Sequence, residues 1–123
     1  MTSRKDLIRE YKERRKPAGI YRITNMVNGK VLLGSSLNLE GVLNGQRFRL
    51  DTGSHRNAAL QQEWKSFGAD AFVLDIVEEV KFSDDPHFNV GDELALLEEI
   101  WLEKLEPYGE RGYNTPGGKI RSV

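Results

Sequence analysis

The feature that most constrains the fold of this chain is an alternating segment followed by a strong turn signal. In residues 19–25, one set of side chains alternates with another, as in a β-strand; the two sets are Ile20, Arg22 and Thr24, and Tyr21, Ile23 and Asn25. Asn28-Gly29 follows, and both residue types tolerate positive φ, which favours a hairpin turn. We expect a returning strand at 30–33, ended by Gly34. The sequence therefore predicts a β-hairpin.

The rest of the chain predicts helices and one further strand. Apolar spacing and capping residues indicate helices at 2–15, 37–48, 57–67 and 93–105, a strand at 71–77 and a brief strand at 111–114. Phe72, Leu74 and Ile76 are expected to face one way. Residues 81–92 predict an acidic loop. These elements indicate a single α+β domain, which suits a chain of 123 residues.

The helix ends have recognisable signals. Ser3 with Asp6 resembles a capping box, Asn57 is the expected cap of the 57–67 helix, and Gly68 its stop. Ser36 or Asn38 is the expected cap of the 37–48 helix. Two glycines, Gly41 and Gly45, each cost about 1 kcal/mol inside that helix. This segment is therefore expected to be short, irregular, or closely approached by another backbone.

Composition excludes several classes of protein and site. The chain has no cysteine, which rules out disulfide scaffolds, zinc-thiolate sites and thiol nucleophiles. No apolar run reaches the roughly 18 residues of a membrane helix, and the charged N-terminus lacks the apolar core of a secretory signal. Motifs for P-loops, dinucleotide binding, HExxH zinc sites and nucleophile elbows are missing. We therefore expect a cytoplasmic protein without a membrane partner.

Charge is divided unevenly along the chain. Residues 1–68 contain 13 basic and 6 acidic residues, whereas residues 69–111 contain 3 basic and 13 acidic residues. The basic half could bind a polyanion while the acidic half remains exposed to solvent. Two differently charged, solvated faces are the alternative interpretation.

Glu98 is the first candidate functional residue. At about 100° per residue, one arc of roughly 80° around the 93–105 helix contains the apolar residues Leu94, Leu97, Trp101 and Leu105. Glu98 lies only about 20° beyond Leu105. A buried carboxylate costs free energy unless it is paired or binds a cation. Glu98 is therefore a candidate ligand for Mg²⁺, which keeps most of its waters. The alternative is that Glu98 reaches solvent.

Other residues have functional and structural interpretations side by side. Tyr21 has a phenol, whose ordinary pKa near 10 allows proton transfer beside a metal-bound water, but strand tyrosines commonly serve packing. Asn114 follows Gly112 and Tyr113 in a loop, where a turn role is the default. His55 lies near the start of the 57–67 helix, where it is expected either to bind phosphate or to cap the helix. Three arginines are candidates for phosphate contacts, and exposure to solvent is an equal alternative for each: Arg47, Arg49 and Arg56.

Taken together, these residues resemble the GIY-YIG nuclease superfamily. The series that carries the resemblance is Gly19-Ile20-Tyr21, Ile23, Asn25, Asn28-Gly29-Lys30, Gly34-Ser35-Ser36, Leu60-Gln61, Trp64, Gly68, Phe72, Glu98 with Trp101-Leu102, and Gly112-Tyr113-Asn114. It spans residues 19–114, about four-fifths of the chain. The resemblance implies a three-stranded antiparallel sheet flanked by helices, with the N-terminal helix as an addition.

For active members, the resemblance implies cleavage of nucleic-acid phosphodiesters with one divalent metal, Mg²⁺ or Mn²⁺. By position, Tyr21 is the first tyrosine, which assists activation of water, Glu98 is the metal ligand, and Asn114 is the closing asparagine. Nucleic-acid contacts are expected from Arg47, Arg49, His55 and Arg56. DNA is the expected substrate in preference to RNA.

The chain departs from the family pattern in three places. The second tripeptide is Leu32-Leu33-Gly34, so its tyrosine has become Leu32. The position of the family's arginine, eight residues past Gly34, is Val42, and Gln46 stands where many members have histidine. Loss of such groups typically costs about 10²–10⁴ in rate each. Arg47 or Arg49 is a potential substitute if the glycine-containing helix rotates or bends.

Two functions therefore stay open. One is a divergent metal-dependent endonuclease, and the other is a catalytically inactive domain of the same fold that binds nucleic acid or a protein. The expected division is an N-terminal basic helix at 1–17, a GIY-YIG-like domain at 18–115 and a tail at 116–123. A protein partner or a second copy of the chain is expected to associate through the N-terminal helix.

Overall fold

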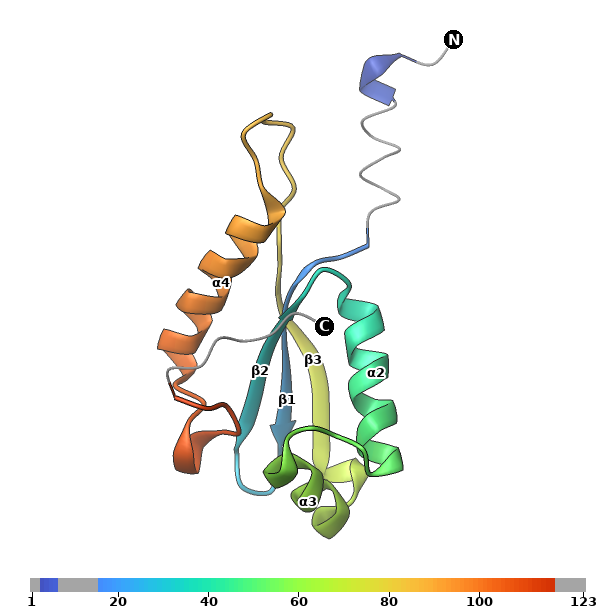
Figure 1. The fold of residues 1–123 in the computed structure, drawn as a ribbon, viewed down its shortest axis with the longest axis vertical. Coiled ribbons are helices and arrows are strands. Elements are labelled where there is room, and N and C mark those ends of the chain that lie inside the picture. Colours follow the sequence, from blue (N-terminus) through green and yellow to red (C-terminus); the bar gives the residue numbers. More distant parts are fainter. Residues whose placement is uncertain (1–2, 7–15, 117–123) are drawn as a thin grey trace.

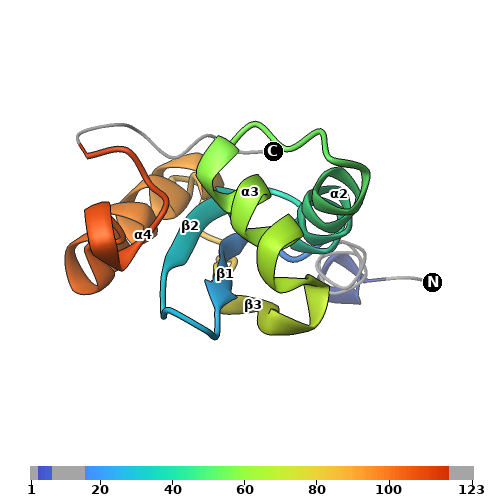
Figure 2. The same cartoon turned by 90° about the horizontal axis from the view of Figure 1, so that it is seen from below.

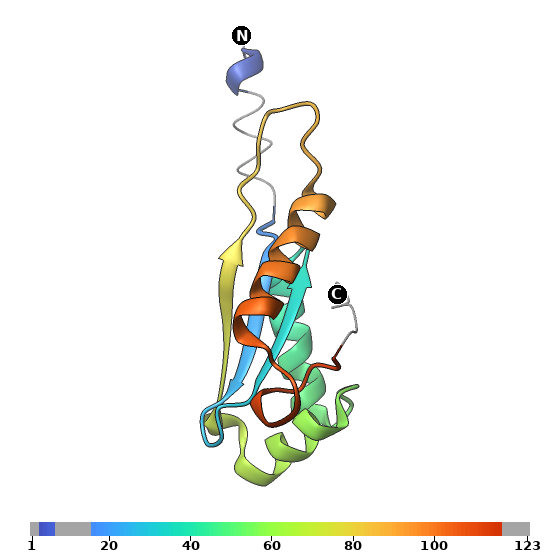
Figure 3. The ribbon, with the colours of Figure 1, turned by 90° about the vertical axis from the view of Figure 1, so that its left-hand side faces the viewer.

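The computed structural model describes residues 3–6 and 16–116. Its body has three layers, with a small sheet between helices on its two faces (Figures 1 and 2). Helix α4 (Val90–Leu105) covers one face. Helices α2 (Leu39–Thr52) and α3 (Ala58–Phe67) lie on the other. The loop between the sheet and α4 extends beyond the end of the sheet (Figure 3).

The sheet has three antiparallel strands in the order β2-β1-β3, as expected from the sequence. Strand β1 (Gly19–Asn25) is central, between β2 (Val31–Ser36) and β3 (Phe72–Glu79). In this register Tyr21 pairs with Gly34 on one side and with Ile76 on the other. A shift in the β1–β3 register lies between Ile20 and Tyr21.

The hairpin is confirmed, but its turn differs from the expected two-residue type. The loop spans residues 26–30, and within it only Gly29 has positive φ, at 78°. Side chains shape this loop, because Asn25 Oδ1 accepts from Val27 N at 2.9 Å and Asn28 Oδ1 accepts from Lys30 N at 3.0 Å. Such local bonds let asparagine replace a tight backbone turn.

In residues 16–116 the helices expected at 37–48, 57–67 and 93–105 are confirmed, but two of them are longer than expected. Helix α2 begins after the Asn38 cap and continues to Thr52, because Leu50 lies in the core on the face that follows Leu39, Val42 and Gln46. Helix α4 begins at Val90, since Asn89 accepts from Asp92 N and caps it. The 3₁₀ helices η1 (Ala69–Ala71) and η2 (Gly109–Arg111) follow α3 and α4.

Alternation along β1 separates the core into two sides. Ile23 packs with Leu50, Leu60, Trp64, Phe72 and Tyr113 under α2 and α3. Ile20 packs with Ala18, Leu33, Val80 and Leu94 under α4, and the predicted apolar sector of α4 lies against this cluster. Phe72, Leu74 and Ile76 pair with alternate residues of β1, so they face one way as expected, although Ile76 is 42% exposed. Among the residues that the structure describes, the edge strand β3 has a neighbour strand only at β1.

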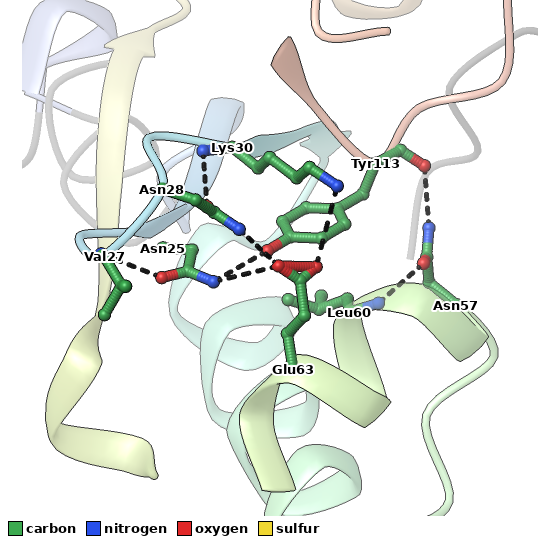
Figure 4. A network of polar contacts seen from close by, with 8 residues as sticks. All are labelled: Asn25, Val27, Asn28, Lys30, Asn57, Leu60, Glu63 and Tyr113. Carbon is green, nitrogen blue, oxygen red and sulfur yellow. Dashed lines mark hydrogen bonds and ion pairs between the residues drawn. The ribbon is translucent and has the colours of Figure 1, made fainter. Parts of the chain in front are cut away.

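The closing segment seals the outer edge of β2. Gly112 forms a parallel bridge with Val31, and Tyr113 N donates to Val31 O at 3.0 Å. The expected strand at 111–114 is therefore a single bridge. The Tyr113 side chain is buried beneath the hairpin, where Asn25 Nδ2 donates to its hydroxyl at 3.2 Å (Figure 4).

A polar network joins the hairpin loop to α3 (Figure 4). The Glu63 carboxylate accepts from Asn25 Nδ2 at 3.2 Å and from Asn28 Nδ2. Asn57 caps α3 through Leu60 N and donates to Tyr113 O at 2.8 Å. One asparagine therefore fixes both the start of α3 and the closing segment.

The N-terminal expectations fall mainly outside the described residues. Arg4–Asp6 are helical, and Ser3 Oγ accepts from Asp6 N at 3.1 Å, as the capping pattern predicts. The remainder of the 2–15 helix and most of the tail at 116–123 lie outside the described residues. Across the two described ranges, every helix is too short or too polar to pass through a bilayer.

Asn57 provides a stability test with a built-in comparison. Asn57→Ser keeps a capping oxygen but does not reach Tyr113, so we expect a loss of about 1 kcal/mol in unfolding free energy. Asn57→Ala removes both bonds, and we expect a loss of about 2 kcal/mol. Urea denaturation measures both values. Equal stability of both variants and the parent would contradict the dual role of Asn57.

Candidate active site

Tyr21 lies at the centre of the candidate site, buried between the sheet and α2. Its ring packs against Leu39 and Val42 and lies directly over the backbone of Gly34. A Cβ at position 34 would lie 2.3 Å from Tyr21 Cζ, so any side chain there would displace the phenol. Gly34 is therefore required by the close approach of the ring.

Glu98 reaches the same strand from the opposite helix. Its side chain is half-buried and accepts a hydrogen bond from Ser35 Oγ. This agrees with the expected carboxylate within the apolar sector and not with the alternative that Glu98 reaches solvent. Because Ser35 follows Gly34, only strand β2 separates Glu98 from Tyr21. The Glu98 charge acts on the phenol across this strand.

Gln46 connects Tyr21 to His55. Its Nε2 donates to the Tyr21 hydroxyl at 3.3 Å, and its Oε1 contacts His55 Nε2. His55 Nδ1 accepts from Asn57 N at 3.0 Å, which leaves Nε2 to carry the ring proton. The direction of the chain is therefore fixed: His55 donates to Gln46, and Gln46 donates to Tyr21.

Arg49 supplies the positive field of this cluster. Burial raises the pKa of Tyr21 to about 12, an effect that Arg49 and the Gln46 hydrogen bond partly oppose. Burial, and then the Arg49 charge, lower the pKa of His55. Burial also raises the pKa of Glu98. At neutral pH the cluster therefore presents a protonated phenol, a neutral imidazole and a guanidinium.

The other candidate residues occupy different places. The Asn114 amide pairs with the backbone of Leu33, accepting from its N and donating to its O at 2.9 Å each. Asn114 therefore fastens the closing segment to β2 one residue before Gly34. The Arg47 guanidinium lies 5.9 Å from the centroid of the Trp64 ring, away from Tyr21. Arg56 is exposed between α2 and α3.

Two residues of the cluster have roles that the sequence did not reveal. Ser35 was part of a matching tripeptide with no role attached, and Gln46 stood as a departure from histidine. The sequence gives no signal for either bond, because each depends on a partner far away in the chain. Leu32 packs in the core with Ile23, and Val42 packs against Tyr21, so these two positions supply neither a proton nor a charge.

The donor set is compatible with one hydrated divalent cation. Glu98 is a half-buried carboxylate whose raised pKa shows that burial is not offset by a nearby positive charge. The described residues contain no group of three or more histidine, aspartate or glutamate side chains able to hold a metal. A single carboxylate suits Mg²⁺, which keeps several waters, better than a cage of protein ligands.

Comparisons with solved structures identify the fold. A mutant of the catalytic domain of the intron endonuclease I-TevI matches with a TM-score of 0.62 and 27% identity, covering 85% of this chain and 99% of that one. The catalytic domain of the homing endonuclease I-TevI matches with a TM-score of 0.59 and 29% identity, covering 79% and 96%. No protein-family model matches, and neither does any curated protein sequence. The chain has the GIY-YIG fold, and the similarity supports a GIY-YIG-like nuclease domain.

His55 gives a pH-dependent test of the cluster. In a His87→Gln background, we expect an NMR titration midpoint for His55 below its ordinary value near 6.5, because burial and Arg49 disfavour the imidazolium. Arg49→Gln should move the midpoint upward. An unchanged midpoint in that variant would contradict the electrostatic coupling.

The same shift makes a prediction for stability. Because the folded-state pKa of His55 is lowered, the unfolded chain binds more protons between that value and about 6.5. Unfolding free energy should therefore fall as the pH decreases through this window. His55→Gln should reduce the slope, as measured by urea denaturation at several pH values.

Proposed function

We propose that this chain is a divergent metal-dependent endonuclease domain that cleaves nucleic-acid phosphodiesters, with DNA as the substrate. The domain corresponds to residues 18–115. The observation that carries the proposal is that Tyr21 and Glu98 contact adjacent residues of strand β2 from its two faces, and that the charges of Arg49 and Glu98 both act on the phenol. A phenol, a guanidinium and a carboxylate are the groups that phosphodiester hydrolysis requires beside one cation.

Hydrolysis forms a bond between a water oxygen and phosphorus while the bond from phosphorus to one ester oxygen breaks. The water loses a proton, and the leaving oxygen gains one. Mg²⁺ or Mn²⁺ held by Glu98 would supply Lewis-acid stabilisation of the charge that develops on the phosphoryl oxygens. Ser35 orients the Glu98 carboxylate through its hydrogen bond.

Tyr21 acts as an orienting group. With a pKa of about 12, its phenol keeps its proton at neutral pH. Because Gln46 donates to the Tyr21 oxygen, the phenol hydrogen is directed elsewhere. Tyr21 can then donate to a phosphate oxygen or hold the attacking water, whereas His55 keeps Gln46 in position.

Arg49 is our candidate for the missing family arginine. Val42 occupies the expected position, and it is buried against the Tyr21 ring. Arg49 lies about two turns further along α2, and its charge acts on both Tyr21 and His55. Arg47 is held near Trp64 and is a better candidate for an outer phosphate contact, as is the exposed Arg56. His55 joins the phosphate site through Gln46 and not as a cation.

A catalytically inactive domain that binds nucleic acid is the second candidate. It is favoured by the apolar packing of Leu32, which is partly buried, and of Val42, which is buried, because this leaves two family roles without a polar group. The basic residues of the 1–68 half would then contact phosphates without cleavage. A protein partner, or a second copy, through the N-terminal segment 1–17 belongs to the same alternative.

Cleavage is tested with purified protein, single- and double-stranded DNA, and Mg²⁺ or Mn²⁺. We expect Glu98→Ala to abolish cutting and Arg49→Ala to lower its rate about 100-fold, since each removes charge stabilisation of the transition state. Glu99→Ala is the matched control on the same helix as Glu98 and should retain most activity. Equal background cutting by Glu98→Ala and the parent would overturn the endonuclease proposal.

Binding is tested separately by anisotropy of labelled DNA without added metal. Phosphate contacts release counterions, so affinity should fall steeply with salt. Salt-dependent binding without metal-dependent cleavage would select the inactive alternative. Failure to bind at low salt would contradict both nucleic-acid hypotheses.

A further inference from the structure

Gly45 is placed in the middle of α2 with no packing reason for a glycine. A Cβ built there meets only the Arg49 guanidinium, at 3.7–3.9 Å, which is ordinary contact. By contrast, a Cβ at Gly41 would lie 2.5 Å from the Asn38 capping side chain. Glycine inside a helix is unfavourable relative to alanine, and one use of it is close approach of a ligand to the backbone.

Phe48 stands beside this glycine on the outer face of α2. Its side chain is 67% exposed, the highest value among the large hydrophobic residues described. At about 100° per residue, Gly45 lies about 60° from Phe48 around the helix, and Arg49 lies about 100° away on the same side. The aromatic ring, the bare backbone and the guanidinium therefore follow one another toward the Tyr21 site.

The charges around Phe48 favour binding of a phosphate on the side of Gly45 and Arg49. The Arg49 guanidinium rests against Gly45, and its field reaches Tyr21 and His55. On the other side of Phe48, Asp51 presents an exposed carboxylate that would repel a phosphate. A polyanion crossing α2 is therefore guided over Gly45 and not over Asp51.

We propose that Phe48, Gly45 and Arg49 form a binding subsite for an unpaired nucleotide of a DNA strand. The base stacks on the Phe48 ring, the sugar-phosphate crosses Gly45, where no side chain projects from the helix, and the phosphate meets the Arg49 guanidinium beside it. Aromatic stacking of this kind accepts any base. The subsite rests on the proposed function and specifies its substrate as DNA with a single-stranded segment.

Further along the same face, the chain offers room for the strand to continue. A polar hollow of about 250 Å³ lies at the start of α2, lined by Lys16, Asn38, Glu40, Gly41 and Asn44. Lys16 and Glu40 carry opposite charges at this end of the helix, so the strand would enter the hollow on its Lys16 side, with the Phe48 subsite nearest to Arg49.

The test is fluorescence anisotropy with a labelled short single strand and the matching duplex, at low salt without metal. Phe48→Ala should weaken binding of the single strand about 10-fold and binding of the duplex much less, because a paired base cannot stack. Phe48→Tyr should restore binding. Phe67→Ala, at the end of α3 where the side chain is 45% exposed, is the matched control and should bind as the parent does.

Gly45→Ala separates binding from folding. It should raise the midpoint of thermal unfolding, because alanine favours the helix, and should weaken binding of the single strand several-fold. If Phe48→Ala and Gly45→Ala both bind like the parent, the subsite is overturned while the proposed function stands. Equal losses with single strand and duplex would also overturn it. If the parent binds neither DNA, the proposed function itself fails.

Discussion

The contact of the Tyr21 ring with the Gly34 backbone is the constraint on which the candidate site depends. Because position 34 has no side chain, the ring can lie on strand β2. The next residue, Ser35, holds Glu98 from the opposite face. A single strand therefore separates two groups that belong to different layers of the fold. The Asn114 amide, paired with Leu33, fixes this strand from outside.

Much of the fold could be predicted from the sequence because its signals are local. Alternation in β1, the Asn57 cap and the apolar sector of α4 each depend on neighbouring residues. The extension of α2 to Thr52 was missed because it depends on burial of Leu50 against Ile23 and Tyr113, which are distant in the chain. The predicted two-residue turn was wrong because the side chains of Asn25 and Asn28 accept hydrogen bonds from the loop backbone and shape a longer loop.

The candidate site was less predictable than the fold. Tyr21 and Glu98 could be named from a motif and from helix geometry, but their relation through Gly34 and Ser35 required the register of β2. In the sequence, Gln46 is a departure from the histidine of many family members, yet its side chain forms hydrogen bonds with both Tyr21 and His55. An amide has no charge to change with pH, so this link keeps one hydrogen-bond direction where histidine would titrate.

The two edge strands of the sheet are protected from pairing with a further strand in different ways. Strand β2 is closed by the bridge to Gly112 and by Asn114. In the described ranges, β3 has a strand neighbour only at β1, and its sequence includes Asp75, Glu78 and Glu79. Carboxylates discourage an added strand while they are ionised. In acid this protection weakens, so β3 is where self-association into larger sheets would begin.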